Sequence, residues 1–138
     1  MITFNTENIE RPDFDTKRIT KWIEDVASSF GKNVGTVNYI FTDDDNILKI
    51  NKEFLQHDYY TDIITFDYSR RKTISGDIYI SVDTVRTNAE LQNVDYEQEL
   101  MRVIIHGILH LCGINDKGPG EREIMESHEN AALSLLGM

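Results

Sequence analysis

Residues 96–116 read YEQELMRVIIHGILHLCGIND and predict a helix that is buried on nearly every side. At about 100° per residue, apolar side chains of this stretch fall on two opposite faces of the helix. One stripe contains Leu100, Val103, Ile104, Gly107 and Leu111, and the other contains Ile105 and Leu109. A helix that is apolar on both faces belongs inside a protein. The other elements of the chain are therefore expected to surround it.

Two histidines and an aspartate near the end of this helix have the spacing of a metal site. His106 and His110 are four residues apart, so both imidazoles lie on one helix face and can reach one ion. Gly113 tolerates a positive φ, which lets the helix end and the chain turn Asp116 back toward the same ion. Three protein ligands leave one coordination position open, as in catalytic zinc sites. We expect His106, His110 and Asp116 to be both metal ligands and catalytic residues.

One Zn²⁺ per chain suits this set of two imidazoles and a carboxylate, and iron, nickel or manganese are alternatives. A pair of hydrogen-bonded structural histidines is the other interpretation of the same spacing. Cys112 is close in sequence but points about 140° away from the histidines on a helical projection. We therefore do not expect Cys112 to be a ligand.

The spacing HxxxHxxGxxD is also that of the metzincin proteases, whose motif begins HExxH. Position 107 is Gly here, whereas those proteases have a Glu that acts as the general base. A metzincin-like peptidase or related metal-dependent hydrolase is thus a disfavoured alternative.

The composition is that of one soluble domain spanning residues 1–138. A single cysteine fits a reducing compartment, and the sequence has neither a secretory signal pattern nor an apolar run of about 18 residues. We therefore expect a cytoplasmic protein without a membrane partner. The net charge of −10 argues against nucleic-acid binding over the whole surface and leaves room for a local basic groove.

Periodicity and capping signals predict an α+β fold, with a small mixed sheet, about five helices and the metal site at the end of a buried helix. The expected strands cover residues 1–5, 34–41, 61–68 and 74–82. The expected helices cover residues 15–30, 42–54 (capped by Thr42), 83–91, 96–112 and 121–136.

Four blocks of the sequence resemble the YbeY family of bacterial endoribonucleases, which act in ribosomal RNA maturation. The blocks are INKEFL (50–55), YTDIITFD (60–67), GDIYIS (76–81) and HGILHLCGIND (106–116). The resemblance implies an α+β fold with a zinc ion held by three histidines in a groove for single-stranded RNA. Asp116 replaces the third histidine, so the site loses one unit of charge and should acidify a bound water less. Leu55 replaces an Arg that is expected to contact phosphate.

This resemblance implies a zinc-dependent, single-strand-specific endoribonuclease that matures the 3′ end of small-subunit ribosomal RNA and acts in ribosome quality control. Its expected partners are ribosomal RNA and the small ribosomal subunit or its assembly factors. Lys52, Arg70 and Arg71 are candidates to replace the missing Arg as RNA contacts. The alternative function is that of a ribosome-associated assembly factor with a mainly structural metal.

Other polar residues are weaker candidates. Thr61 and Asp62 either line the groove or form a turn and cap at the start of a strand. His57 is expected in an exposed loop, and His128 is expected to face solvent on the terminal helix. Neither histidine is predicted to be a ligand.

Overall fold

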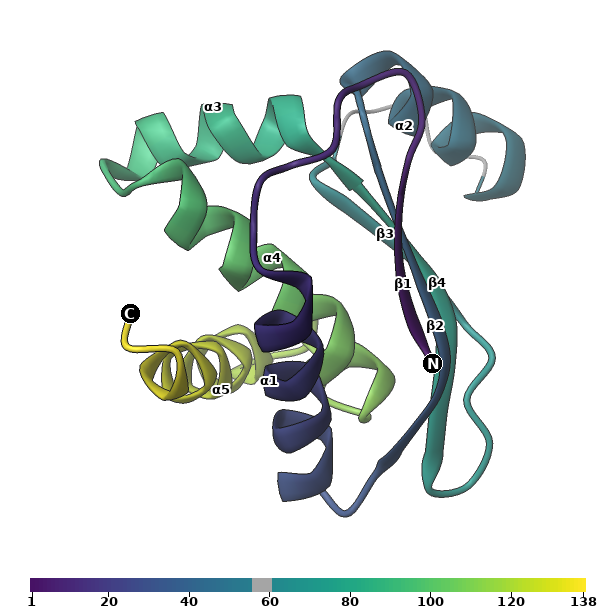
Figure 1. The fold of residues 1–138 in the computed structure, drawn as a ribbon, viewed down its shortest axis with the longest axis vertical. Helices are drawn as coiled ribbons and strands as arrows, with labels where there is room; N and C mark the ends of the chain where they lie inside the picture. Colours follow the sequence, from purple (N-terminus) through teal and green to yellow (C-terminus); the bar gives the residue numbers. More distant parts are fainter. Residues whose placement is uncertain (56–60) are drawn as a thin grey trace.

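The computed structural model describes residues 1–55 and 61–138, in which a four-stranded sheet carries helices on both faces (Figure 1). This architecture confirms the α+β prediction. The elements are β1 (Ile2–Thr6), α1 (Thr16–Ser29), β2 (Asn33–Thr42), α2 (Asp44–Ile50), the π-helical turn η1 (Asn51–Leu55), β3 (Ile63–Asp67), β4 (Thr73–Ser81), α3 (Val82–Gln92), α4 (Tyr96–Leu111) and α5 (Glu121–Leu135). Over the described ranges, no helix is both long and apolar enough to cross a membrane.

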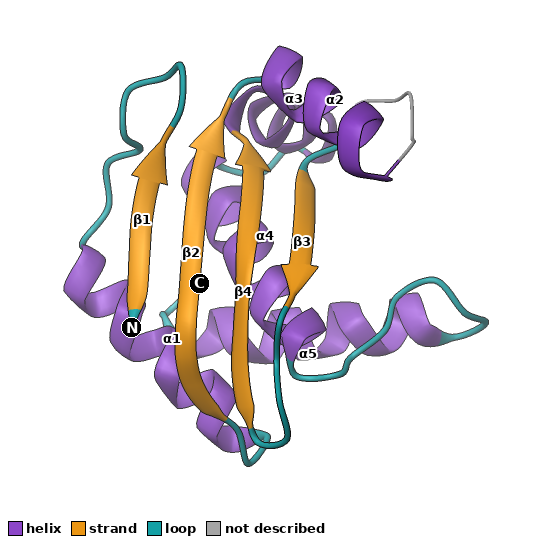
Figure 2. Ribbon diagram, turned by 90° about the vertical axis from the view of Figure 1, so that its right-hand side faces the viewer, coloured by secondary structure: helices purple, strands orange, loops and turns teal. Residues whose placement is uncertain are grey.

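The sheet is mixed, with the strand order β1-β2-β4-β3. β1, β2 and β4 are parallel, and β3 pairs antiparallel with β4 at the edge opposite β1. Figure 2 shows α1, α4 and α5 behind the sheet. On the other face, α2 covers one end of the sheet, where Ile47 and Ile50 pack with Ile64, Phe66 and Tyr79. The prediction of a small mixed sheet is therefore confirmed.

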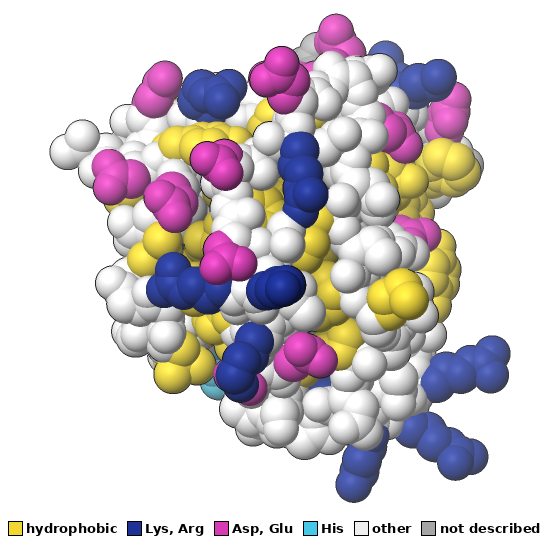
Figure 3. Space-filling model, viewed as in Figure 1, with side chains coloured by type: hydrophobic (Ala, Val, Ile, Leu, Met, Phe, Trp, Pro, Cys, Tyr) yellow, Lys and Arg dark blue, Asp and Glu magenta, His cyan; other side chains and the backbone are white. Residues whose placement is uncertain are grey.

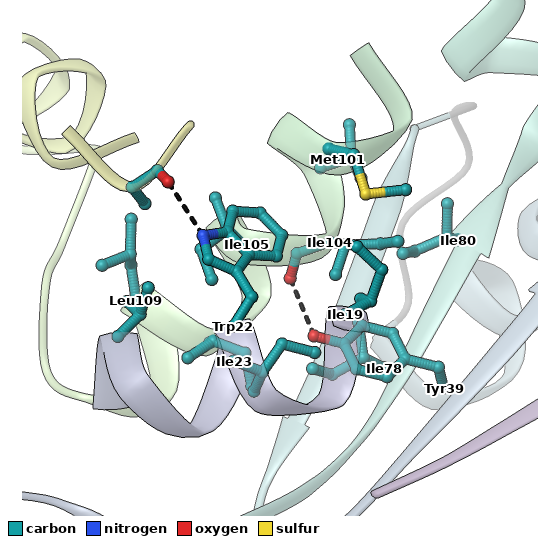
Figure 4. Close-up of a cluster of buried hydrophobic side chains, with 14 of the residues drawn as sticks. Ile19, Trp22, Ile23, Tyr39, Ile78, Ile80, Met101, Ile104, Ile105 and Leu109 are labelled. Carbon is teal, nitrogen blue, oxygen red and sulfur yellow. Dashed lines mark hydrogen bonds between the residues drawn. The ribbon is translucent and has the colours of Figure 1, made fainter. Parts of the chain in front are cut away.

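Helix α4 packs against the sheet and against α1, α3 and α5, and its residues Ile104, Ile105, Ile108 and Leu109 are fully buried. Figure 4 shows that two polar groups reinforce this core. The Tyr39 hydroxyl donates to the Ile104 carbonyl at 2.8 Å and joins β2 to α4. The Trp22 indole N–H donates to the Ala132 carbonyl at 2.8 Å and joins α1 to α5. Both apolar faces predicted for this helix are thus covered.

Helix α4 packs closely against the sheet at Gly107. A Cβ atom at this position would lie 2.9 Å from Ile78 Cδ1 and 3.3 Å from Ile63 Cδ1. A larger residue would have to displace side chains that are packed between helix and strands. A Glu at position 107 would therefore enter the core, which further disfavours a metzincin-like role for this position.

The helix predicted for residues 42–54 begins later and ends earlier in the structure, as α2 (Asp44–Ile50). Thr42 was expected to cap it, but Thr42 is the last residue of β2 and donates its hydroxyl to the Glu7 carbonyl at 3.0 Å. Asp43 is the cap instead, because its carboxylate accepts from the backbone N–H of Asn46 at 2.9 Å. The α-helix stops at Ile50, and η1 continues it as a wider π-helical turn.

Replacing Gly107 by Glu is expected to destabilise the protein by about 3 kcal/mol or more, because the change combines overpacking with burial of a carboxylate. Thermal and urea unfolding measure the loss, with Gly107→Ala as the smaller control. Gly107→Glu is also expected to show no peptidase activity. A stable Gly107→Glu protein that hydrolyses peptides would contradict this account of the helix–sheet contact.

Candidate functional site

The three predicted ligands, His106, His110 and Asp116, line one pocket of about 880 Å³. Its walls come from η1, the start of β3, α3, α4, the loop after α4, and α5. Leu55, the position where the family resemblance implies an Arg, lies in the same wall. Thr61 and Asp62 line the pocket too. Residues far apart in the sequence therefore share one polar site.

A tight turn after α4 brings Asp116 back to the histidines. Gly113 has a φ of +100°, and its N–H donates to the His110 carbonyl at 3.0 Å. The next N–H, of Ile114, donates to the Leu109 carbonyl at 3.0 Å. The chain then reverses, and Asp116 Oδ2 lies 3.3 Å from His106 Nε2. This geometry follows the role predicted for Gly113.

The second ring nitrogen of His106 contacts a buried carboxylate on α5. His106 Nδ1 lies 2.7 Å from Glu129 Oε2, and Glu129 is 6% exposed. The other oxygen, Glu129 Oε1, accepts from Arg102 Nη1 at 2.9 Å. Arg102 Nη2 also donates to Asn130 Oδ1 at 2.7 Å. His106 thus lies between two carboxylates that come from different segments.

Carboxyl groups outnumber Lys and Arg side chains in the lining of the pocket. Burial disfavours a charged His106, but the hydrogen bond and charge of Glu129, together with Asp116 and Asp62, raise its pKa above the usual value. Burial raises the pKa of Asp62, opposed by the charge of His106. Burial also raises the pKa of Glu99, whose Oε1 has no hydrogen-bond partner among the described residues. Carboxyl groups gathered in this way favour binding of a cation.

Within residues 1–55 and 61–138, no three His, Cys, Asp or Glu side chains are gathered closely enough to hold a metal ion. The pair His106 Nε2 and Asp116 Oδ2 nevertheless has a suitable spacing of 3.3 Å. Two ligand atoms about 2.1 Å from one tetrahedral zinc ion lie roughly 3.4 Å apart. The spacing of this pair therefore fits zinc, and His110 as the third ligand stays a prediction.

The basic residues that line the pocket differ from those predicted. Arg102, Lys117 and Arg122 line it, whereas Lys52, Arg70 and Arg71 do not. The first residues of β3 line the pocket. Arg70 and Arg71 come after the last residue of β3, in the turn that leads to β4. Figure 3 shows basic side chains projecting from the corner where Figure 1 places that turn. RNA contact by Lys52, Arg70 and Arg71 stays a prediction.

The remaining histidines have separate outcomes. His57 lies outside the described residues. His128 was expected to face solvent, but this was wrong: it is half-buried, with its ring edge-on to Phe30 at 5.2 Å between centroids.

Sequence reasoning missed Glu129 and Arg102. A signal for Glu129 was present, because it interrupts the apolar stripe of α5 formed by Met125, Ala132 and Leu133. A charged residue in a stripe that faces the core needs a partner there.

Comparison with known proteins identifies the family. The sequence profile described as "Endoribonuclease YbeY" matches residues 2–137. The chain belongs to the YbeY endoribonuclease family. "Endoribonuclease YbeY" of Phocaeicola vulgatus is 61% identical over 138 residues, which cover all of both chains. The protein of the same name from Porphyromonas gingivalis is 51% identical over 135 residues, or 98% of this chain and 89% of the other.

A solved structure has a similar fold. The solution structure of TM1509 from Thermotoga maritima matches with a TM-score of 0.66 and 27% sequence identity. The match covers 99% of this chain and 91% of the other. The YbeY family assignment and the fold therefore rest on nearly the whole chain.

The thiol of Cys112 is expected to react slowly with iodoacetamide. Burial raises its pKa to about 11, although the charge of Lys32 opposes the shift. At about pH 8, roughly one thiol in a thousand is then ionised, and only the thiolate is nucleophilic. Alkylation should be at least about 10-fold slower than in the unfolded chain and unchanged by added zinc. Protection by zinc would instead identify Cys112 as a ligand.

Proposed function

We propose that this protein is a zinc-dependent endoribonuclease that cleaves single-stranded RNA during ribosomal RNA maturation. The observation that supports the proposal is that His106, His110 and Asp116 all line one pocket of a YbeY-family chain. His106 and Asp116 already have the spacing of two ligands to one ion. His110, one helical turn further along the same face, supplies the third ligand.

A zinc ion held there supplies a Lewis acid for phosphate and lowers the pKa of water from about 15.7 toward 7–9. The chain's own groups position the substrate. Lys117 and Arg122 are exposed at the pocket, where each can contact a phosphate. They replace the phosphate contact that the family resemblance implies for an Arg at position 55. Either water or the RNA 2′-hydroxyl is the nucleophile, and these contacts serve both routes.

The pocket also supports the choice of a single strand. Its walls are helix faces and strand ends, and polar residues such as Asn88 and Gln92 line it beside the charged groups. A single strand can turn its bases toward such groups, whereas a duplex hides the base edges in its grooves. In the cell, we propose that the substrate is the 3′ end of small-subunit ribosomal RNA in the cytoplasm. The small subunit or its assembly factors deliver that RNA, and the same cleavage serves ribosome quality control.

A second candidate function is that of an assembly factor that uses its metal only for stability. The net charge of −10 and Leu55 in the pocket wall favour this alternative. The two functions differ in what metal removal does: it abolishes RNA cleavage in the first and only lowers stability in the second.

Replacing His110 by Ala is expected to abolish stoichiometric zinc binding, because only two protein ligands, His106 and Asp116, remain. RNA cleavage should fall by more than the roughly 10- to 100-fold that follows loss of a residue supporting a metal ligand. Asp116→His restores the ligand set implied by the family and should keep or raise activity. The measurement is cleavage of a single-stranded ribosomal RNA fragment by metal-quantified protein. If wild type and Asp116→His both contain zinc and are no more active than His110→Ala, the nuclease is refuted and the assembly factor is favoured.

Neutralising Lys117 and Arg122 together is expected to lower the affinity for RNA and to make that affinity less dependent on salt concentration. Each lost phosphate contact reduces the slope of log K against log salt by about 0.7, so the Lys117→Gln, Arg122→Gln double variant should lose about 1.4. Binding of a single-stranded oligoribonucleotide to metal-depleted protein is measured at several salt concentrations.

The matched control is the Arg70→Gln, Arg71→Gln double variant, which loses the same charge at the far end of β3. It is expected to change the slope little. If the slope changes more in the control than in the pocket variant, the RNA contacts the turn between β3 and β4 instead of Lys117 and Arg122.

A further inference from the structure

The contact between α4 and α5 beneath the pocket is a chain of charged and polar groups. Arg102 donates to Glu129 Oε1 at 2.9 Å, and Glu129 Oε2 lies 2.7 Å from His106 Nδ1. The side chain of Glu129 is 7% exposed, against 24% for Arg102 and 23% for His106. Asn130 accepts from the other guanidinium nitrogen at 2.7 Å. The buried carboxylate is therefore bound on both oxygens.

These contacts determine which nitrogen of His106 carries the proton when the ring is neutral. A carboxylate only accepts hydrogen bonds, so Glu129 requires a proton on Nδ1. Nε2 then keeps its lone pair, and it is Nε2 that lies 3.3 Å from Asp116 in the pocket. A lone pair facing a carboxylate is repulsive unless a proton or a metal ion lies between them. The arrangement thus presents His106 as a ligand.

Arg102 explains why a carboxylate is needed at position 129. Both neighbours of Glu129 are donors, and a carboxylate can accept from both at once. A glutamine amide has one accepting end and one donating end. Its oxygen would turn to the charged Arg102, because charge-assisted hydrogen bonds are stronger. Its NH₂ group would then face His106 Nδ1, which would have to accept.

We propose that Glu129, bound by Arg102, is a positioning residue that sets the tautomer of His106 and presents its Nε2 to the metal. This inference rests on the metal site proposed above. Glu129 itself does not touch the metal or the RNA. Residues in this position relative to a metal typically change metal affinity by about 10- to 100-fold when they are lost.

The experiment compares Glu129→Gln, the Glu129→Gln, Arg102→Met double variant, and the control Glu126→Gln. Glu126 is an exposed residue of α5 at the same pocket, and its replacement removes the same charge. Zinc affinity is measured by competition with a chromophoric chelator. In metal-free protein at alkaline pH, ¹⁵N NMR of the imidazoles reports the tautomer of His106, with His128 as an internal reference. Thermal unfolding reports stability separately.

Glu129→Gln is expected to move the proton from Nδ1 to Nε2 and to weaken zinc binding about 10- to 100-fold. Removing Arg102 as well frees the amide oxygen to face His106, so the double variant should regain the Nδ1 proton and part of its zinc affinity. A residue with a purely structural role would lower the melting temperature and leave the tautomer unchanged.

The proposal would be overturned if His106 in Glu129→Gln kept its proton on Nδ1 and this variant bound zinc as tightly as Glu126→Gln does. A tautomer that changes in Glu129→Gln and does not return in the double variant would overturn the part assigned to Arg102. If Glu129→Gln fails to fold, the double variant decides, and a proton on its Nε2 counts against the proposal. If wild type binds no zinc, the metal site proposed above fails, and the tautomer still tests Glu129 in the metal-free protein.

Discussion

The direct packing of α4 on the sheet is the constraint on which the other features of this protein depend. Gly107 allows the approach, because a Cβ there would already lie 2.9 Å from Ile78. Helices α1 and α5 cover the opposite side of α4, and Trp22 joins them through the Ala132 carbonyl. Only one stripe of α4 is left to face a pocket, and Glu99, Arg102, Val103, His106 and His110 form it. The site is thus the part of the central helix that the core leaves uncovered.

Two carboxylates reach His106 by different physical routes. Asp116 arrives locally, through the turn at Gly113, within a few residues of the helix end. Glu129 arrives through tertiary packing, because α5 must lie against α4 for the contact to form. Burying the Glu129 carboxylate alone would be costly, and the Arg102 guanidinium offsets that cost. The core therefore holds a charged pair at a place where it can act on an imidazole.

What the sequence predicted well was local. The buried helix, the turn at Gly113 and the approach of Asp116 to His106 all depend on one continuous stretch, residues 96–116. The cap at Asp43 was missed because Thr42 is an equally good capping residue, and only the extent of β2 decides between them. Strand pairing sets that extent, and no short window of sequence contains it.

What the sequence did not predict depends on the directions of elements in space. Arg70 and Arg71 were candidates to replace the missing Arg, yet they follow the end of β3 that lies away from the pocket. Glu129 was not singled out from the sequence, because its partners Arg102 and His106 are more than twenty residues away. Its position within the apolar stripe of α5 was the one available sign.

The central claim is that a metal ion joins His106, His110 and Asp116 in this pocket. Anomalous diffraction from crystals of the zinc-loaded protein, with data on both sides of the zinc absorption edge, tests it most directly. The account predicts one strong anomalous peak within bonding distance of His106 Nε2, an imidazole nitrogen of His110 and a carboxylate oxygen of Asp116. A peak bound by other residues, or none in crystals of protein shown to contain zinc, would contradict it.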